Sequence, residues 1–385
     1  MNVLLAFRDE LRLLATKPIY WFCMLFIPLF LIFFFTDMMK EGLPTDLPAG
    51  IVDLDNSATT RKLMRNLDSF QETHVVAHYA SVNEARLDMQ KGRIYAFFYL
   101  PKNFESDLIS SRQPTISFYY NSSVMIAGSL LYKEMRVIST LGQAALGSAT
   151  MQAKGATEKQ IKAFLQPIAT DVHATNNPWL NYNMYLSTTM VPACIALFIF
   201  IVTAFSLGAE LKYGRARHMV SRANNNITLA LLAKFLPQTI IWFVVVMIYE
   251  FWLYDVYGFT HNCSWLFLVC LGLLLILSSQ GLGIFFFGIF PSMRMSMSIA
   301  ALWSVLSFSV AGFTFPVMAM DAEIQAMSWL FPIRSHYMIY QINVLNGFPI
   351  HYSWPYFTAL IAFALLPTLV GRRIKHVLLN HIYIE

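Results

Sequence analysis

Two long apolar runs separated by a short basic segment constrain the fold of this chain more than any other feature. The first run extends from Tyr182 to Leu207 without a charged residue, and the second extends from Phe235 to Tyr254 with Glu250 as its one charged residue. A helix needs about 20 apolar residues to cross the hydrocarbon core of a bilayer. Both runs are therefore predicted to be membrane spans joined as a hairpin.

The segment between the two runs, Gly208–Arg222, carries four Lys or Arg residues. Short loops rich in Lys and Arg are retained on the cytoplasmic side of a membrane, so a cytoplasmic hinge is predicted over residues 208–228. The same bias holds along the whole chain. Twelve Lys or Arg residues lie at the predicted inner ends of spans, whereas Arg334 is alone in the short outer loops.

The composition agrees with a membrane protein. Hydrophobic residues make up 57% of the chain and charged residues 13%, which is far from the balance found in soluble domains. The net charge of +5 comes largely from Lys and Arg at span ends, so nucleic acid is not predicted as a partner. Three of the four cysteines lie inside apolar runs and Cys263 lies at a loop edge, which predicts neither a disulfide framework nor a metal site.

Six spans are predicted in a polytopic α-helical membrane protein with both termini in the cytoplasm. An amphipathic helix over Met1–Thr16 precedes the first span, because Leu4, Phe7, Leu11 and Leu14 share one helical face; a simple polar lead-in is the alternative. No small-residue cleavage site follows the first run, so residues 1–36 are predicted to be retained as an anchor. The predicted spans are Ile19–Phe35, Tyr182–Leu207, Phe235–Tyr254, Trp265–Phe290, Met295–Phe315 and Pro355–Val370.

Residues 37–180 contain no spanning run and are predicted to form an inserted extracytoplasmic α/β domain, because strand patterns alternate with helix patterns. Ser57 and Ser81 are placed to cap the first two helices. The region holds no phosphate loop, catalytic triad or cluster of metal ligands, so its histidines are predicted to be ordinary residues and no enzyme is predicted. The predicted strands are Gly50–Asp55, Thr73–Tyr79, Arg93–Leu100 and Thr115–Tyr120, followed by a long helix over Val124–Lys154.

Residues 181–385 hold the remaining five spans. Between the fifth and the sixth, residues 316–354 form an outer segment that is too long for a turn and too interrupted for a span. Two short helices are predicted there, Asp321–Trp329 and His336–Val344, with a break at Phe331–Arg334. Polar groups at membrane depth are tolerated where they line a cavity or pack within protein.

Several short motifs occur in a fixed order relative to the predicted spans. They are Glu10 and Pro18 before the first span, Asp53-x-Asp55-x-Ser57 and Gly92 with Pro101-x-x-Phe104 in the inserted domain, Glu210-x-x-x-Gly214 after the second span, and Gly312-x-x-x-Pro316 with Leu330-x-Pro332 after the fifth. This order resembles the permease subunits of type-2 ATP-binding-cassette (ABC) exporters, in the branch with a large extracytoplasmic domain between spans one and two. Arg215 and Ala233 depart from the family pattern, which has threonine and glycine at those places.

The resemblance implies a subunit that moves a substrate outward while a separate cytoplasmic ATPase binds ATP and Mg and supplies the work. The sequence agrees, since it contains no phosphate loop of its own. The resemblance further implies the bacterial inner membrane, a second permease copy or paralogue, and a periplasmic adaptor as a further partner. The residues expected to transmit the force of the ATPase are Glu10, Glu210, Lys212, Gly214, Arg215 and Arg217. The alternative for the hinge charges is that they only fix topology.

Candidate residues for a substrate pathway lie in the spans and the outer segment. Glu250 is ionisable inside a span, which favours a function, although its place near the outer end also allows it to reach the headgroups. Gln280 is expected to bond a neighbouring helix, and Ser296, Ala300 and Ser304 form a small-residue stripe that allows close helix packing. The full set of candidates is Glu250, Gln280, Ser296, Ser304, Pro316, Pro332 and Arg334.

A second class of function stays open, namely a membrane-anchored receptor or assembly factor whose extracytoplasmic domain binds a ligand or a partner protein. Six spans are more than an anchor requires, which favours the exporter. The sequence does not distinguish drug, lipid, peptide and polysaccharide substrates, nor a homodimer from a heterodimer.

Overall fold

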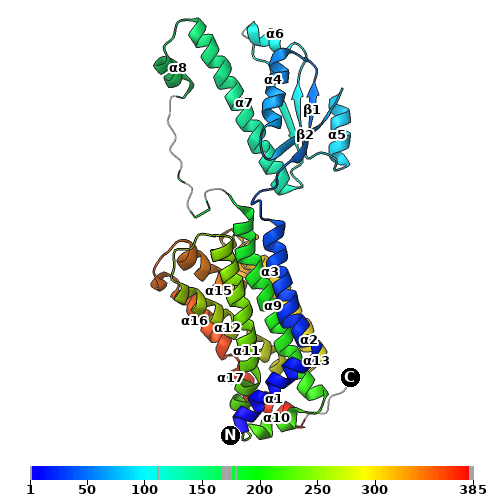
Figure 1. The fold of residues 1–385 in the computed structure, drawn as a ribbon, viewed down its shortest axis with the longest axis vertical. Helices are drawn as coiled ribbons and strands as arrows, with labels where there is room; N and C mark the ends of the chain where they lie inside the picture. Colours follow the sequence, from blue (N-terminus) through cyan, green and yellow to red (C-terminus); the bar gives the residue numbers. More distant parts are fainter. Residues whose placement is uncertain (1, 111, 167–172, 174–175, 178–179, 381–385) are drawn as a thin grey trace. The chain divides into compact units, whose positions relative to one another are not determined.

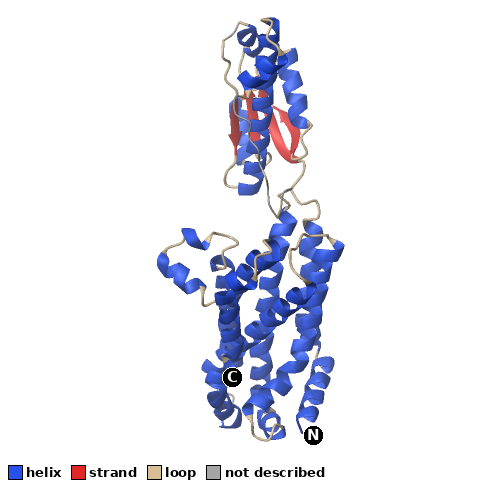
Figure 2. Ribbon diagram, turned by 90° about the vertical axis from the view of Figure 1, so that its left-hand side faces the viewer, coloured by secondary structure: helices blue, strands red, loops and turns tan. Residues whose placement is uncertain are grey.

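The computed structural model describes residues 2–110, 112–166, 173, 176–177 and 180–380. The chain divides into two compact units, of which the first combines Met1–Lys40 with Thr175–Glu385 and the second is Glu41–Ala174. The first unit is helical, and all four strands described here belong to the second (Figures 1 and 2). Each unit is built around its own apolar core.

Six helices in the described part of the chain are long and apolar enough to cross a membrane, as predicted. The first consists of α2 (Pro18–Trp21), a π-helical turn (Phe22–Phe26) and α3 (Ile27–Met38). The others are α9 (Tyr182–Lys212), α11 (Ile227–Phe251) with a π-helical turn (Trp252–Val256), α12 (Trp265–Ile289), α13 (Met293–Val310), and α16 (Trp354–Leu365) continued by α17 (Pro367–Asn380). The protein is a polytopic, mostly helical membrane protein.

Three of the six helices form the centre of the helical unit. The apolar windows of α9, α11 and α12 are 56–67% buried, whereas those of the first, fifth and sixth spans are 17–28% buried. Helix α12 packs against α9, α11, α16 and α17, and α13 packs along α9. Spans one, five and six therefore present most of their apolar surface outward.

Helix α1 (Asn2–Thr16) packs on α11 and on α10 (Ala216–Arg222), and α10 in turn packs on α17. These contacts place the start of the chain, the hinge after α9 and the last described helix at one end of the helical unit (Figure 1). The hinge therefore packs against helices from both ends of the described chain.

The segment between α13 and α16 contains α14 (Ala322–Ser328) and α15 (Pro332–Ile339), which is continued by a π-helical turn (Tyr340–Leu345). Short 3-10 turns occur at Val317–Ala319 and Ile350–Tyr352. The second predicted helix was placed wrongly at His336, because Pro332 occupies the first helical turn, where a proline costs no hydrogen bond. The fifth span also ends at Val310 rather than Phe315.

The second unit holds a four-stranded sheet in the order β2-β1-β3-β4. Strand β1 pairs parallel with β2 and β3, and β4 pairs antiparallel with β3. The strands are β1 (Leu47–Asp53), β2 (Thr73–His78), β3 (Ala96–Leu100) and β4 (Ser117–Tyr120). The first strand begins three residues before the predicted Gly50, because Leu47 and Ala49 are buried in the core beside Ile51.

Helices cover both faces of this sheet. Helices α4 (Ala58–Asp68) and α7 (Met125–Ala153) enclose one apolar core, and α5 (Val82–Gln90) encloses another on the opposite face (Figure 1). Two short helices, α6 (Phe104–Ile109) and α8 (Glu158–Leu165), complete the described elements. Both predicted capping serines are confirmed, since Ser57 accepts from the Thr60 amide and Ser81 from the Glu84 amide.

Candidate functional site

A buried charge cluster joins three helices at the hinge end of the helical unit. Glu10 comes from α1, Ser206 and Glu210 lie one turn apart on α9, and Lys234 and Gln238 lie one turn apart on α11. Residues four apart share a helical face, so α9 and α11 each direct a pair of polar side chains toward the same place. These five residues are called the charge cluster below.

Lys234 lies at the centre of the charge cluster. Its Nζ donates to Glu10 Oε2 at 2.9 Å and to Glu210 Oε1 at 3.1 Å. Gln238 Nε2 donates to Glu10 Oε1 at 3.0 Å and to Ser206 Oγ at 2.9 Å. Each carboxylate is therefore held by donors from α11, and Glu10 and Glu210 are linked to each other through a single ammonium group.

The charges of the cluster are balanced at its edge by Arg215, whose Nη2 lies 3.3 Å from Glu210 Oε1. The carboxylates of Glu10 and Glu210 are thus balanced by the cations of Lys234 and Arg215. Lys234 is 2% exposed, Glu210 5% and Glu10 7%, so water screens these charges little. Removing one member of a buried ion pair costs about 3–5 kcal/mol because the other charge is left uncompensated. The cluster therefore fixes α1, α9 and α11 relative to one another.

Helix α9 ends inside the hinge, in a turn that favours glycine. Gly214 has φ +66°, the amide of Gly214 donates to the Leu211 carbonyl, and the amide of Arg215 donates to the Glu210 carbonyl at 2.9 Å. This pair of bonds is the Schellman arrangement, in which a residue of positive φ ends a helix. The Glu210-x-x-x-Gly214 motif thus places the Glu210 side chain in the cluster and turns the chain into α10.

Four basic residues lie on either side of this turn, exposed or half-buried. Arg217 is exposed and donates from Nε to the Leu379 carbonyl at 3.0 Å, and Arg222 forms an ion pair with Asp9 of α1. Lys212 and Arg215 are half-buried. The hinge is therefore tied to α1 and to α17 while its cations stay accessible.

The structure shows where Glu10 and Glu210 lie. Both were expected to transmit the force of the ATPase, and both are buried, so neither can touch a partner directly. In α1 the buried face carries Glu10 and Leu14, whereas Leu11 of the predicted apolar face is 47% exposed. Lys234, which we expected to be a charge at a span end, is in the interior because α11 begins at Ile227 instead of Phe235. The spacing of Lys234 and Gln238 puts two polar side chains on one face of an apolar helix, which could have suggested a buried polar site but not its partners.

Two groups of the predicted pathway residues serve helix packing. The Gln280 Oε1 atom accepts from Thr239 of α11 at 2.8 Å, as the expected bond between helices. Ser296, Ala300 and Ser304 are buried, and Ala300 shares a core with residues of α9. The small-residue stripe is therefore used within the chain, against the second span, so it is not free for contact with another subunit.

Arg334 closes the end of the fifth span. Its Nη1 donates to the Ala311 carbonyl at 2.9 Å, where a cation also meets the negative end of the α13 dipole. Gly312 has φ +101°, and a Cβ at that position would lie 2.5 Å from Arg334 Nη1. Pro332 is buried at the start of α15, whereas Pro316 is exposed. The Gly312-x-x-x-Pro316 motif thus makes room for an arginine from α15.

Glu250 is 6% exposed. Of the two interpretations of Glu250, the one in which its carboxylate reaches the lipid headgroups is wrong, because the side chain points into the helical unit, where it lines a small cavity with His336. Among the described residues, no group of three or more His, Cys, Asp and Glu side chains is arranged to hold a metal ion.

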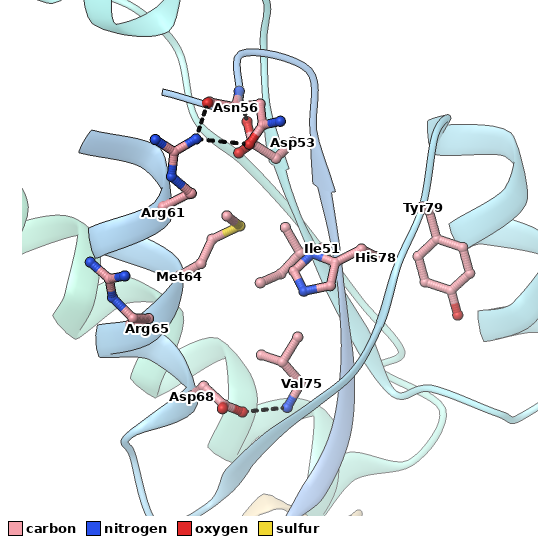
Figure 3. A pocket seen from close by; sticks show the side chains of 10 residues that line it. All are labelled: Ile51, Asp53, Asn56, Arg61, Met64, Arg65, Asp68, Val75, His78 and Tyr79. Carbon is pink, nitrogen blue, oxygen red and sulfur yellow. Dashed lines mark hydrogen bonds between the residues drawn. The ribbon is translucent and has the colours of Figure 1, made fainter. Parts of the chain in front are cut away.

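The second unit carries an open cleft of 490 Å³ between α4 and the strands β1 and β2. Figure 3 shows Ile51, Met64 and Val75 between the helix and the strands, and Arg61 and Arg65 along α4. Arg61 donates to Asn56, and Asp68 accepts from the Val75 amide at 2.8 Å. Burial, together with a hydrogen bond from its hydroxyl to Asp88, raises the pKa of Tyr79 at the edge of this cleft.

The acidic motif beside this cleft is structural. Asp53 accepts from the amides of Asp55 and Asn56, each at 3.0 Å, and from the Thr60 hydroxyl at 2.8 Å. Asp55 accepts from the amide of Glu105 at 3.1 Å, at the start of α6. Asp53-x-Asp55-x-Ser57 therefore shapes the turn between β1 and α4 and caps two helices.

The sequence was compared with models of known protein families and with curated proteins. The model of the family described as "ABC-2 family transporter protein" matches residues 18–372, which is most of the chain. The chain belongs to the ABC-2 transporter family. No curated protein matches it. Helix α1, which contributes Glu10 to the charge cluster of this ABC-2 permease, precedes the matched residues.

Proposed function

We propose that this ABC-2 permease is the membrane subunit of an ABC exporter, and that a separate cytoplasmic ATPase, which binds ATP and Mg, drives its outward transport. Family membership supports an ABC ATPase as partner. The single observation that carries the mechanism is the charge cluster, because it links α1 and the hinge end of α9 to α11 through Lys234.

In this proposal the ATPase acts on the exposed part of the hinge and the cluster transmits the movement. Arg217 and Arg222 both belong to α10. The Asp9–Arg222 ion pair ties α10 to α1. A push on α10 therefore acts on α1 and on the end of α9 at once. Since Lys234 holds both helices to α11, three helices would move as one body.

The proposed orientation places α1, α10 and α17 in the cytoplasm and the second unit outside. The concentration of Lys and Arg at span ends and in the hinge supports it. We also propose that a second copy or a paralogue completes the pathway. Phe22, Phe26, Phe30 and Phe34 of the first span support this, because their rings stack in a row at 5.4–6.4 Å and face outward.

The experiment is ATP turnover by a candidate ATPase, encoded beside this chain, with and without the permease in lipid nanodiscs. Glu210→Gln combined with Lys234→Met removes one charge of each sign and leaves Glu10 and Arg215, so the cluster stays neutral. We expect this double variant to bind the ATPase but to lose most of the permease-dependent stimulation. Arg217→Ala combined with Arg222→Ala should instead weaken binding.

Arg136→Ala is the matched control, since it removes an exposed arginine from α7 of the second unit. It should leave binding and stimulation unchanged. The mechanism is wrong if the charge-cluster variant is stimulated as strongly as the natural protein.

A receptor or assembly factor is the second candidate function, and the cleft between α4 and the strands is the observation that favours it. Its lining combines an apolar floor with arginine and aspartate side chains. A permease that neither binds nor stimulates any ABC ATPase, and whose partner binding is abolished by Arg65→Ala, would support this function instead.

A further inference from the structure

A largely enclosed cavity of about 10 Å³ lies in the helical unit between α9, α11, α12 and α15. A cavity of this volume has room for about one water molecule. The polar side chains that line it are Tyr249 and Glu250 of α11 and His336 of α15, and the other lining residues carry apolar side chains or none. Two ionisable groups from different helices therefore line one small site that is largely closed to bulk solvent.

The carboxyl group of Glu250 is not fully satisfied by the side chains that the structure describes. Its Oε2 atom is buried without a hydrogen-bond partner among the described residues, and a bare carboxylate in apolar surroundings is costly unless it is paired or neutralised. His336, which is 5% exposed, is the basic residue in the cavity lining. A buried ionisable residue in a membrane helix indicates a function by default.

The titratable groups facing Glu250 come from four places. Tyr249 belongs to α11 itself, Tyr254 to its π-helical turn, and Cys263 to the following loop. Tyr340, like His336, comes from the α15 side. The cavity-lining residues of α9 and α12 do not titrate. All of the described neighbours except His336 are neutral or anionic, so only the imidazole can compensate a carboxylate here.

A hydrogen-bonded pair of tyrosines lies one helical turn beyond Glu250 and His336. Tyr254 follows Glu250 by one turn, Tyr340 follows His336 by one turn, and the Tyr254 hydroxyl donates to that of Tyr340 at 3.2 Å. The Tyr254 ring lies 4.9 Å from the ring of His261 in the loop, which is partly exposed. Both tyrosines sit in π-helical turns, which occur often at functional sites.

We propose that Glu250 and His336 form a proton-binding site, with one enclosed water between them, that holds α15 against α9 and α11. One proton converts the carboxylate to a carboxylic acid, which donates to the water, and the water donates to the unprotonated imidazole nitrogen. When the proton leaves, a bare carboxylate remains and α15 loosens. The site does not depend on the direction of transport or on an ATPase.

The first test is infrared spectroscopy of the purified full-length protein in lipid nanodiscs, titrated with pH. The natural protein should show the stretching band of a protonated carboxyl group at neutral pH that is absent from Glu250→Gln. His336→Gln should move the frequency of this band, because the group that accepts from the water is lost. Asp255→Asn is the matched control, five residues away on the exposed surface, and should leave the band in place.

The second test is hydrogen exchange of residues 332–345, corrected for the intrinsic pH dependence of the exchange rate. Their protection should fall at alkaline pH in the natural protein and in Asp255→Asn, and should be independent of pH in Glu250→Gln. The proposal is overturned if no carboxyl band distinguishes the natural protein from Glu250→Gln, if His336→Gln leaves its frequency unmoved, or if protection is equally independent of pH in all variants.

Discussion

Lys234 is the residue whose removal leaves the largest uncompensated charge. In Lys234→Met the carboxylates of Glu10 and Glu210 would face each other in a buried environment without the ammonium between them. We expect a loss of about 3–5 kcal/mol in the free energy of unfolding, as for other buried pairs that lose one partner. The apparent melting temperature in nanodiscs, followed by tryptophan fluorescence, measures it.

Lys17→Met is the control for this prediction, because Lys17 follows α1 and is exposed. It should melt close to the natural protein. Adding Glu210→Gln to Lys234→Met should restore part of the loss, since one buried carboxylate instead of two then lacks the ammonium group. Equal melting temperatures for the two lysine variants would show that the cluster does not stabilise the fold.

Gly312 is needed for two reasons: its backbone has a positive φ, and the absence of a side chain leaves space for Arg334. Gly312→Ala should cost about 1 kcal/mol or more, because alanine is strained at φ +101° and its Cβ would displace the guanidinium. Gly258→Ala is the matched control, with φ +64° and open space around it, and should show the backbone strain alone. Thermal melting should therefore rank Gly312→Ala below Gly258→Ala, and the reverse order would contradict the role given to Arg334.

Residues whose roles depend on local sequence were predicted well, and residues whose roles depend on distant partners were not. Ser57 and Ser81 each accept from an amide three residues further along the chain, so their local spacing is enough to predict that they cap helices. Glu10 and Lys234 are 224 positions apart, and nothing in either local pattern shows that they meet. For the same reason Glu10 was assigned to the polar face of a surface helix.

At the scale of elements, the contact of α13 with α9 rests on small side chains. Ala300→Leu would insert a large side chain where Ala300 is fully buried, and overpacking of this kind costs about 1–3 kcal/mol. Ser298→Leu changes an exposed position two residues earlier on the same helix and should be close to neutral in lipid. Comparing the two melting temperatures tests whether the stripe packs within one chain, since equal values would indicate that it does not.

Helix ends show why element boundaries are harder to predict than elements. The fifth span was expected to continue to Phe315, because the residues after Val310 are mostly apolar, yet the backbone turns at Gly312. The second helix of the outer segment was started too late, at His336, because Pro332 was read as a break instead of a first turn. The π-helical turns at Trp252–Val256 and Tyr340–Leu345 have no distinctive residue composition. The spacing of apolar residues therefore could not predict them.

At the scale of the whole molecule, hydrophobic length was sufficient to predict six spanning helices, because a bilayer imposes one length on all of them. The contacts among those helices were not predictable in the same way. Apolar residues surround each span, so the sequence alone does not tell which face meets protein and which meets lipid. The small-residue stripe on α13 and Glu250 are buried because of how the helices pack together. Hydropathy alone does not predict that packing.

Orientation is the remaining property of the whole molecule, and it is tested by labelling. In a variant with Cys23, Cys194, Cys263 and Cys270 replaced by serine or alanine, single cysteines are introduced at Ser122 in the second unit and at Ser221 in α10. Both positions are exposed. Because Lys and Arg concentrate at the hinge end, a membrane-impermeant thiol reagent should label Ser122→Cys from outside, and Ser221→Cys only after the membrane is opened. Labelling of Ser221→Cys in sealed membranes would invert the topology and place the hinge out of reach of any ATPase.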